Sequence, residues 1–134
     1  MENKQKILIL GAKGNLGQQL IKVFLFKKKY KVIAWDKNDL DITNKNKVNK
    51  KIVQLNPDII INTAAYNAVD ACEKNKKQFE LAKEINGYAV GYIAKVAEEI
   101  GAIFVHYSTN YVFDGRNKNG YSQIQLITMV RVNC

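Results

Sequence analysis

Short, continuous apolar runs alternate along this chain with longer segments in which apolar residues recur every three or four positions. A continuous apolar run is typical of a strand covered on both faces of a parallel sheet, and the wider spacing is typical of an amphipathic helix. The predicted strands are 6–10, 30–35, 58–62 and 102–107, and the predicted helices are 16–26, 41–57 and 70–100. This alternation predicts an α/β fold, a doubly wound parallel sheet (Rossmann-like) that is incomplete at its C-terminal end. We expect the strand order 3-2-1-4, with the site above strands 1 and 4.

The helical patterns carry their own start and stop signals. The second helix opens near Asp41 with Thr43 or Asn44 as the N-cap. Its inner side is predicted to consist of its larger apolar residues, Val48, Ile52, Val53 and Leu55. In the third helix Asn86-Gly87 interrupts the pattern, either as a bend, as a polar side chain reaching back toward the site, or as a tolerated glycine.

Length and composition fit a single domain. The 134 residues are enough to bury a core, and no apolar run is long enough to cross a membrane. The start lacks the apolar segment of a signal peptide, so we expect a cytoplasmic protein. The two cysteines, Cys72 and Cys134, are far apart and fit reduced thiols better than a metal site or a disulfide framework.

The net charge of +9 comes mainly from lysine, since Arg116 and Arg131 are the only arginines. Lysines form short, surface-like clusters at 27–29, 50–51 and 74–77, which we place at helix ends and between elements. A solvated surface and a nucleic-acid patch are both compatible with such clusters. The scarcity of arginine, whose fork suits phosphates, favours the solvated surface and makes nucleic-acid binding unlikely.

A glycine-rich turn, residues 11–17, joins the first strand to the first helix. Gly11 allows a tight turn, Gly14 lets a pyrophosphate approach the backbone, and Gly17 lets the helix pack on the strand. The unpaired N–H groups and the dipole of the helix N-terminus favour a phosphate there. A flexible surface turn is the alternative, but the flanking elements favour a dinucleotide site.

Polar and small residues follow the other strands at the edge where α/β sheets bind ligands. Asp36 follows Gly14 by 22 residues, near the spacing of the acid that holds the adenosine ribose, although a turn role is also open. Tyr66 and Asn67 follow two alanines after the third strand. These small residues leave room for a ligand, so that Tyr66 and Asn67 would face the cofactor, although packing alone would also explain the alanines. His106 lies within the fourth strand, where a sheet-face imidazole is favoured over a catalytic one.

With these residues the chain resembles the dTDP-4-dehydrorhamnose reductase family of the extended short-chain dehydrogenase/reductase superfamily. The resemblance rests on ordered segments that run from the first strand to about Tyr121: 11–17, 35–36, 39–43, 62–66 with 68–70, and 108–115. The first two segments are shared by many nucleotide-binding folds. The third and fifth, in this order, are specific to the reductase group and its close relatives.

The resemblance implies a cofactor site for NADPH or NADH. Pyrophosphate contacts fall to Gly14, Asn15 and Leu16, while Asp36, Asp41 and Ile42 surround the adenosine. The nicotinamide side is implied to be lined by Ala64, Ala65, Tyr66 and Asn67, with Tyr107 near the cofactor. Asp36 favours a free ribose hydroxyl and therefore NADH, whereas Lys13 and Lys37 offset its repulsion of a 2′-phosphate, so both cofactors are expected to be usable.

The resemblance also implies a nucleotide-sugar substrate, dTDP-4-dehydrorhamnose, and suggests a homodimer for the full-length protein. Thr109 matches the catalytic hydroxyl that hydrogen-bonds the substrate carbonyl. Asn110, in place of the usual aspartate, and Tyr111 are implied to contact the sugar. No metal site is expected.

The family pattern changes after Tyr121. The family continues with a proline-containing acidic loop and a Tyr-x-x-x-Lys pair, neither of which this sequence contains. We therefore expect residues 1–121 to form an NAD(P)-binding domain and 122–134 to be a divergent or truncated tail. Since the phenol of that pair donates the proton, the chain is expected to be inactive alone. The alternative is a non-catalytic NAD(P)-binding regulatory or interaction module.

Overall fold

The computed structural model describes residues 3–109 and 115–120. Strands and helices alternate in the first half as β1 (Gln5–Leu10), α1 (Asn15–Phe26), β2 (Tyr30–Trp35), α2 (Lys45–Leu55) and β3 (Ile59–Asn62). A helical run follows, made of α3 (Val69–Lys74), α4 (Lys76–Lys83), the π-helical turn η1 (Glu84–Tyr88) and α5 (Ala89–Ile100), and it leads into β4 (Ile103–His106). The α/β prediction is confirmed.

All strand pairings in the described part are parallel, in the order β2-β1-β3-β4. The expected order 3-2-1-4 is therefore wrong, because the third strand pairs with β1 on the side opposite β2. The chain leaves β1 toward one edge and then crosses back over β1 on its way to β3. A periodic pattern defines each strand but carries no information about the direction of each crossover.

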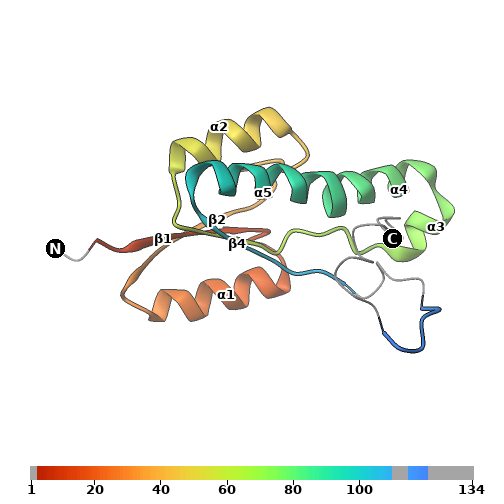
Figure 1. Ribbon diagram of the computed structural model, residues 1–134, viewed down its shortest axis with the longest axis horizontal. Helices are drawn as coiled ribbons and strands as arrows, with labels where there is room; N and C mark the ends of the chain where they lie inside the picture. The colour runs from red at the N-terminus through yellow and green to blue at the C-terminus, as the bar shows by residue number, and fades with distance from the viewer. Residues whose placement is uncertain (1–2, 110–114, 121–134) are drawn as a thin grey trace.

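Helices cover both faces of the sheet (Figure 1), with α1 on one face and α2 and α5 on the other. The alternating side chains of β1 divide accordingly. Ile7 and Ile9 are fully buried and pack with residues of α1, whereas Leu8 and Leu10 belong to the core beneath α2 and α5. The continuous apolar run of the first strand therefore reflects burial on both faces.

The second helix, α2, is shorter than the predicted 41–57, and its N-cap is Asn44, one of the two predicted candidates. The side chain of Asn44 accepts a hydrogen bond from the backbone N–H of Lys47, 3.0 Å away. Val48 and Ile52 are fully buried, but Val53, which we expected on the inner side, is 44% exposed. Val53 follows directly after Ile52, so the helical rotation turns it away from the core.

The predicted helix 70–100 is broken at two places. Asn75 ends α3 and caps α4, since its side chain accepts a hydrogen bond from the N–H of Lys77 at 2.9 Å. The second break is η1, which contains the Asn86-Gly87 pair. Gly101, with φ of 71°, is the C-cap of α5.

The corrected strand order also changes where the site is expected. Because β2 and β3 lie on opposite sides of β1, the chain directions diverge between β1 and β3. In open α/β sheets ligands bind above such a point, at the carboxyl ends of the strands. The crevice is therefore expected where Gly11 and Thr63 follow β1 and β3, not above the first and fourth strands.

Candidate functional site

The glycine turn is packed against the segment that follows β3. Gly11 has φ of +79°, and a Cβ on it would lie 2.6 Å from the backbone nitrogen of Ala64. A Cβ on Gly17 would lie 2.3 Å from the carbonyl oxygen of Gly11. The roles predicted for these two glycines, a tight turn and close packing of helix on strand, are what the geometry requires.

Thr63 ties the same two segments together. Its hydroxyl donates to the carbonyl oxygens of Leu10 at 2.7 Å and Gly11 at 3.2 Å, and its backbone N–H also donates to Leu10. Thr63 was not among the residues predicted to form the site. The only signal in the sequence was its place directly after a buried strand.

The N-terminus of α1 is open toward the crevice. Gly14 is the N-cap, no side chain of the described residues caps this end, and the first turn contains no acid. The first N–H groups of the helix therefore keep their hydrogen-bonding capacity and their partial positive charge. Such an end suits an anionic group, and the absence of a side chain on Gly14 leaves the approach clear.

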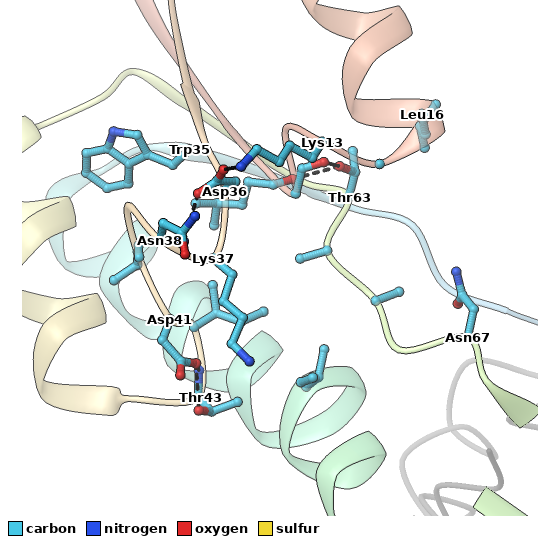
Figure 2. Close-up of a pocket in the computed structure, with 18 of the residues that line it drawn as sticks. Lys13, Leu16, Trp35, Asp36, Lys37, Asn38, Asp41, Thr43, Thr63 and Asn67 are labelled. Atoms are coloured by element: carbon cyan, nitrogen blue, oxygen red, sulfur yellow. Dashed lines mark hydrogen bonds and ion pairs between the residues drawn. The ribbon is translucent and has the colours of Figure 1, made fainter. Parts of the chain in front are cut away.

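Asp36 lies at the end of β2, where its carboxylate forms an ion pair with the ammonium of Lys13 (Figure 2). The other carboxylate oxygen accepts hydrogen bonds from the N–H groups of Asn38 at 2.7 Å and Asp39 at 3.3 Å. The hydrogen bond from Lys13 and that from Asn38 lower the pKa of Asp36, and Asp36 in turn raises the pKa of Lys13. Asp36 thus has the turn role that was left open, while its contact with a ribose stays a prediction.

Asp41 provides a second carboxylate on this side. Its oxygen accepts from the hydroxyl of Thr43 at 2.7 Å and from the backbone N–H of the same residue at 3.0 Å. The hydroxyl bond is the main cause that lowers the pKa of Asp41, and the positive charge of Lys37 adds to it. In Figure 2 the side chain of Lys37 extends into the space between this carboxylate and the rest of the pocket.

These segments enclose a cavity of about 750 Å³. Most predicted cofactor residues line it: Gly11, Gly14, Asn15, Leu16, Asp36, Asp41, Ile42, Ala64, Ala65, Asn67 and Tyr107. Gly17 and Tyr66 are not among its lining residues in the described part of the chain. The wall also contains residues that the sequence analysis missed: Leu10, Trp35, Asn38, Leu40, Thr43, Thr63, Leu81 and Ile85. Of these, Leu81 and Ile85 were detectable as an i, i+4 pair in the helical pattern.

Of the residues predicted to contact the substrate, the structure describes Thr109. Thr109 lies just beyond β4 and is exposed, and it does not line the cavity, so its catalytic role stays a prediction. Asn110 and Tyr111 lie outside the described residues. His106 is on the sheet, with its Nδ1 3.2 Å from the amide nitrogen of Asn62, and burial lowers its pKa.

Two wider searches cover residues 3–109 and 115–120. No group of three or more histidine, cysteine, aspartate or glutamate side chains is arranged there to hold a metal ion. No helix in these ranges has both the length and the apolar character needed to span a membrane.

The parallel sheet, the glycine turn and the open helix N-terminus define a Rossmann-like nucleotide-binding protein. More narrowly, the chain belongs to the RmlD substrate binding domain family, whose model matches residues 5–127. A dTDP-4-dehydrorhamnose reductase of Aggregatibacter actinomycetemcomitans is 38% identical over 122 residues, which are 91% of this chain and 40% of the relative. The chain therefore spans about two fifths of the length of the curated relatives it matches.

Solved structures give the same result. The dTDP-4-dehydrorhamnose reductase of Bacillus anthracis, in complex with NADP, is 39% identical, with a TM-score of 0.76 over 89% of this chain and 41% of that one. The reductase of Clostridium acetobutylicum is 44% identical, with a TM-score of 0.77 over 89% of this chain and 41% of that one. The resemblance stated from the sequence is thus confirmed at the level of the family.

Proposed function

We propose that this chain is the NADP(H)-binding part of a cytoplasmic reductase that converts dTDP-4-dehydrorhamnose to dTDP-L-rhamnose. One observation carries the proposal: the cavity that joins the open N-terminus of α1 to the carboxylate of Asp36. Its wall offers amide donors for a diphosphate and an acceptor for a ribose, in the order along a Rossmann sheet that a dinucleotide requires. The solved relative with NADP supports the same cofactor.

Each part of the wall has a proposed task. Gly14, Asn15 and Leu16 bind the diphosphate through backbone N–H groups, because the helix N-terminus has no side-chain cap. The segment from Asp36 to Thr43 surrounds the adenosine, with Lys37 available to a 2′-phosphate. Ala64 and Ala65 leave room beside the nicotinamide, which supplies the hydride that reduces the C4 ketone when bound.

The proton for the resulting alkoxide is not explained by these residues. The hydroxyl of Thr109 is a candidate to hydrogen-bond the ketone oxygen and so orient it. A threonine hydroxyl is too weak an acid to protonate it efficiently, and the 134 residues contain no Tyr-x-x-x-Lys pair. This supports the second candidate function, a non-catalytic NAD(P)-binding module, for the chain acting alone.

Calorimetry followed by a turnover assay separates the two candidates. Titration of the chain with NADPH and NADH tests the cofactor site, and the absence of heat with both would reject both candidates. Oxidation of NADPH upon addition of dTDP-4-dehydrorhamnose would then reveal reductase activity. Saturable binding without oxidation is the result expected of a cofactor-binding module.

A further inference from the structure

Asn86 is a polar residue on the buried side of a helical run. It lies in η1, between Ala82 and Ala89, both of which are fully buried. The N–H of Ala89 donates to the carbonyl of Glu84, five residues back, which is the wide turn of a π-helix. Such turns are rare and are frequent at functional sites. A partly buried amide among apolar neighbours needs hydrogen-bond partners, and their identity indicates what it does.

Both ends of the Asn86 amide bond the backbone of one residue. Its oxygen accepts from the N–H of Tyr66 at 2.8 Å, and its nitrogen donates to the carbonyl of Tyr66 at 3.0 Å. The side chain therefore pairs with Tyr66 as a neighbouring strand would. Tyr66 lies beyond the end of β3, so its backbone N–H and carbonyl have no neighbouring strand to bond, and the Asn86 amide provides their partners.

The same segment lines the cavity with its other side. Ala64, Ala65 and Asn67 line the cavity, whereas Tyr66 does not, and the hydroxyl of Tyr66 donates to the side-chain oxygen of Gln78. Asn86 itself does not line the cavity. It holds the backbone of Tyr66, which lies between the cavity-lining residues Ala65 and Asn67, and so helps to fix their position.

We propose that Asn86 is a positioning residue that shapes the nicotinamide side of the cofactor pocket by holding the backbone of Tyr66. This inference rests on the proposed function, because it assigns a task within the NADP(H) site. The adenosine side is built from a different part of the chain, the segment from Asp36 to Thr43. Loss of the Asn86 amide should therefore weaken binding of the nicotinamide half of the cofactor and leave binding of the adenosine half unchanged.

Two ligands and two variants test the proposal on the 134-residue chain. NADPH occupies both halves of the pocket, whereas 2′,5′-ADP carries only the adenosine half. Asn86→Ala removes both hydrogen bonds, and Asn86→Leu removes them while keeping most of the side-chain volume. We expect each variant to bind NADPH about tenfold more weakly, the loss that corresponds to roughly one net hydrogen bond, and to bind 2′,5′-ADP within about twofold of the wild type. Exchange of the Tyr66 amide hydrogen should be faster in both variants.

The control is Asn49→Ala, which removes an exposed amide of α2 that bonds Glu99 at 3.2 Å. It should leave both affinities unchanged. Equal weakening of NADPH and 2′,5′-ADP in the Asn86 variants would assign a general structural role and overturn the proposal, as would unchanged NADPH affinity. If the wild-type chain binds neither ligand, the proposed function itself fails. If the wild type binds both ligands but the Asn86 variants do not weaken NADPH more than 2′,5′-ADP, only the role of Asn86 is rejected and the proposed function stands.

Discussion

The ammonium of Lys13 and the carboxylate of Asp36 form an ion pair that links the glycine turn after β1 to the end of β2. The side chain of Lys13 is 76% exposed and that of Asp36 only 16%. The lowered pKa of Asp36 favours a charged carboxylate in the cavity wall, and the ammonium paired with it is exposed to solvent. The two opposite charges bear directly on the choice between a ribose hydroxyl and a 2′-phosphate.

Asp36→Ala is expected to weaken NADH binding more than NADPH binding. In the proposed site this carboxylate would accept hydrogen bonds from the free ribose hydroxyls of NADH, and it would repel the 2′-phosphate of NADPH. A hydrogen bond to a charged group contributes about 1.5–3 kcal/mol, so NADH affinity should fall by about tenfold or more. Calorimetric titration of both cofactors measures this, with the exposed Asp70→Ala as the control. Equal losses for the two cofactors would argue against the assignment.

Lys37→Ala is expected to weaken NADPH binding more than NADH binding, the reverse of Asp36→Ala. Lys37 lines the cavity, and its positive charge is close enough to help lower the pKa of Asp41. Removing it takes a cation from the proposed 2′-phosphate position, so NADPH affinity should fall several-fold while NADH affinity changes little. The difference should shrink at high salt, because salt screens charges in an open site. Lys50→Ala, on the exposed side of α2, controls for the change in net charge, and a similar effect from that variant would contradict the prediction.

Gly17→Ala and Gly91→Ala form a matched pair of helix substitutions. A Cβ at Gly17 would lie 2.3 Å from the Gly11 carbonyl oxygen, whereas one at Gly91 in α5 would meet nothing within 4 Å. We expect Gly17→Ala to lower the free energy of unfolding by about 1–3 kcal/mol, as overpacking commonly does. Gly91→Ala should raise it by about 0.5–1 kcal/mol. Urea denaturation measures both, and a stable Gly17→Ala variant would show that the turn is not tightly packed.

The chain contains one histidine, His106, so its titration can be followed without overlap. Burial lowers its pKa below the ordinary value of 6.5. Protonation then favours the unfolded state. The neutral imidazole of His106 makes its full contribution to the free energy of unfolding above pH 6.5. This contribution is lost as the pH falls from 6.5 through the lower pKa of the folded state. Ring-proton NMR shifts give the pKa directly.

Asn62→Asp tests whether the side chain at position 62 influences the pKa of His106. Asn62 contacts His106 through its amide nitrogen and accepts from the N–H of Ala64 through its oxygen. The aspartate keeps that acceptor and brings a negative charge to the imidazole, so the pKa of His106 should rise. An unchanged pKa would mean that the two side chains are not in contact.

Local sequence features predicted the elements and the glycine roles well. The strands around Ile9 and Ile61 were recognisable because each contains an unbroken apolar run, 7–10 and 59–61. Asn44 caps its helix because its side chain can reach a free N–H. Gly11 and Gly17 were identifiable because a strand followed at once by a helix leaves no room for side chains at these points. Asn86 was noted as a polar interruption, although its partner Tyr66 was not foreseen.

The order of the strands and the contacts between distant residues could not be predicted from the sequence pattern. The position of β3 beside β1 depends on the direction of a crossover, which leaves no trace in periodicity. Thr63 was missed because its importance lies in contacts with Leu10 and Gly11, which are more than fifty residues away in the sequence. The side chain of Asn75 competes with the helix for a backbone N–H, a local effect that the apolar spacing around it concealed.

The most direct test of the account is an NMR titration of the isotope-labelled chain with NADPH, followed through its backbone amides. The account predicts saturable binding, with the largest shift changes at the N–H groups of Gly14, Asn15, Leu16 and Gly17, where the diphosphate is proposed to lie. Absence of binding, or shift changes confined to residues remote from the N-terminus of α1, would contradict it.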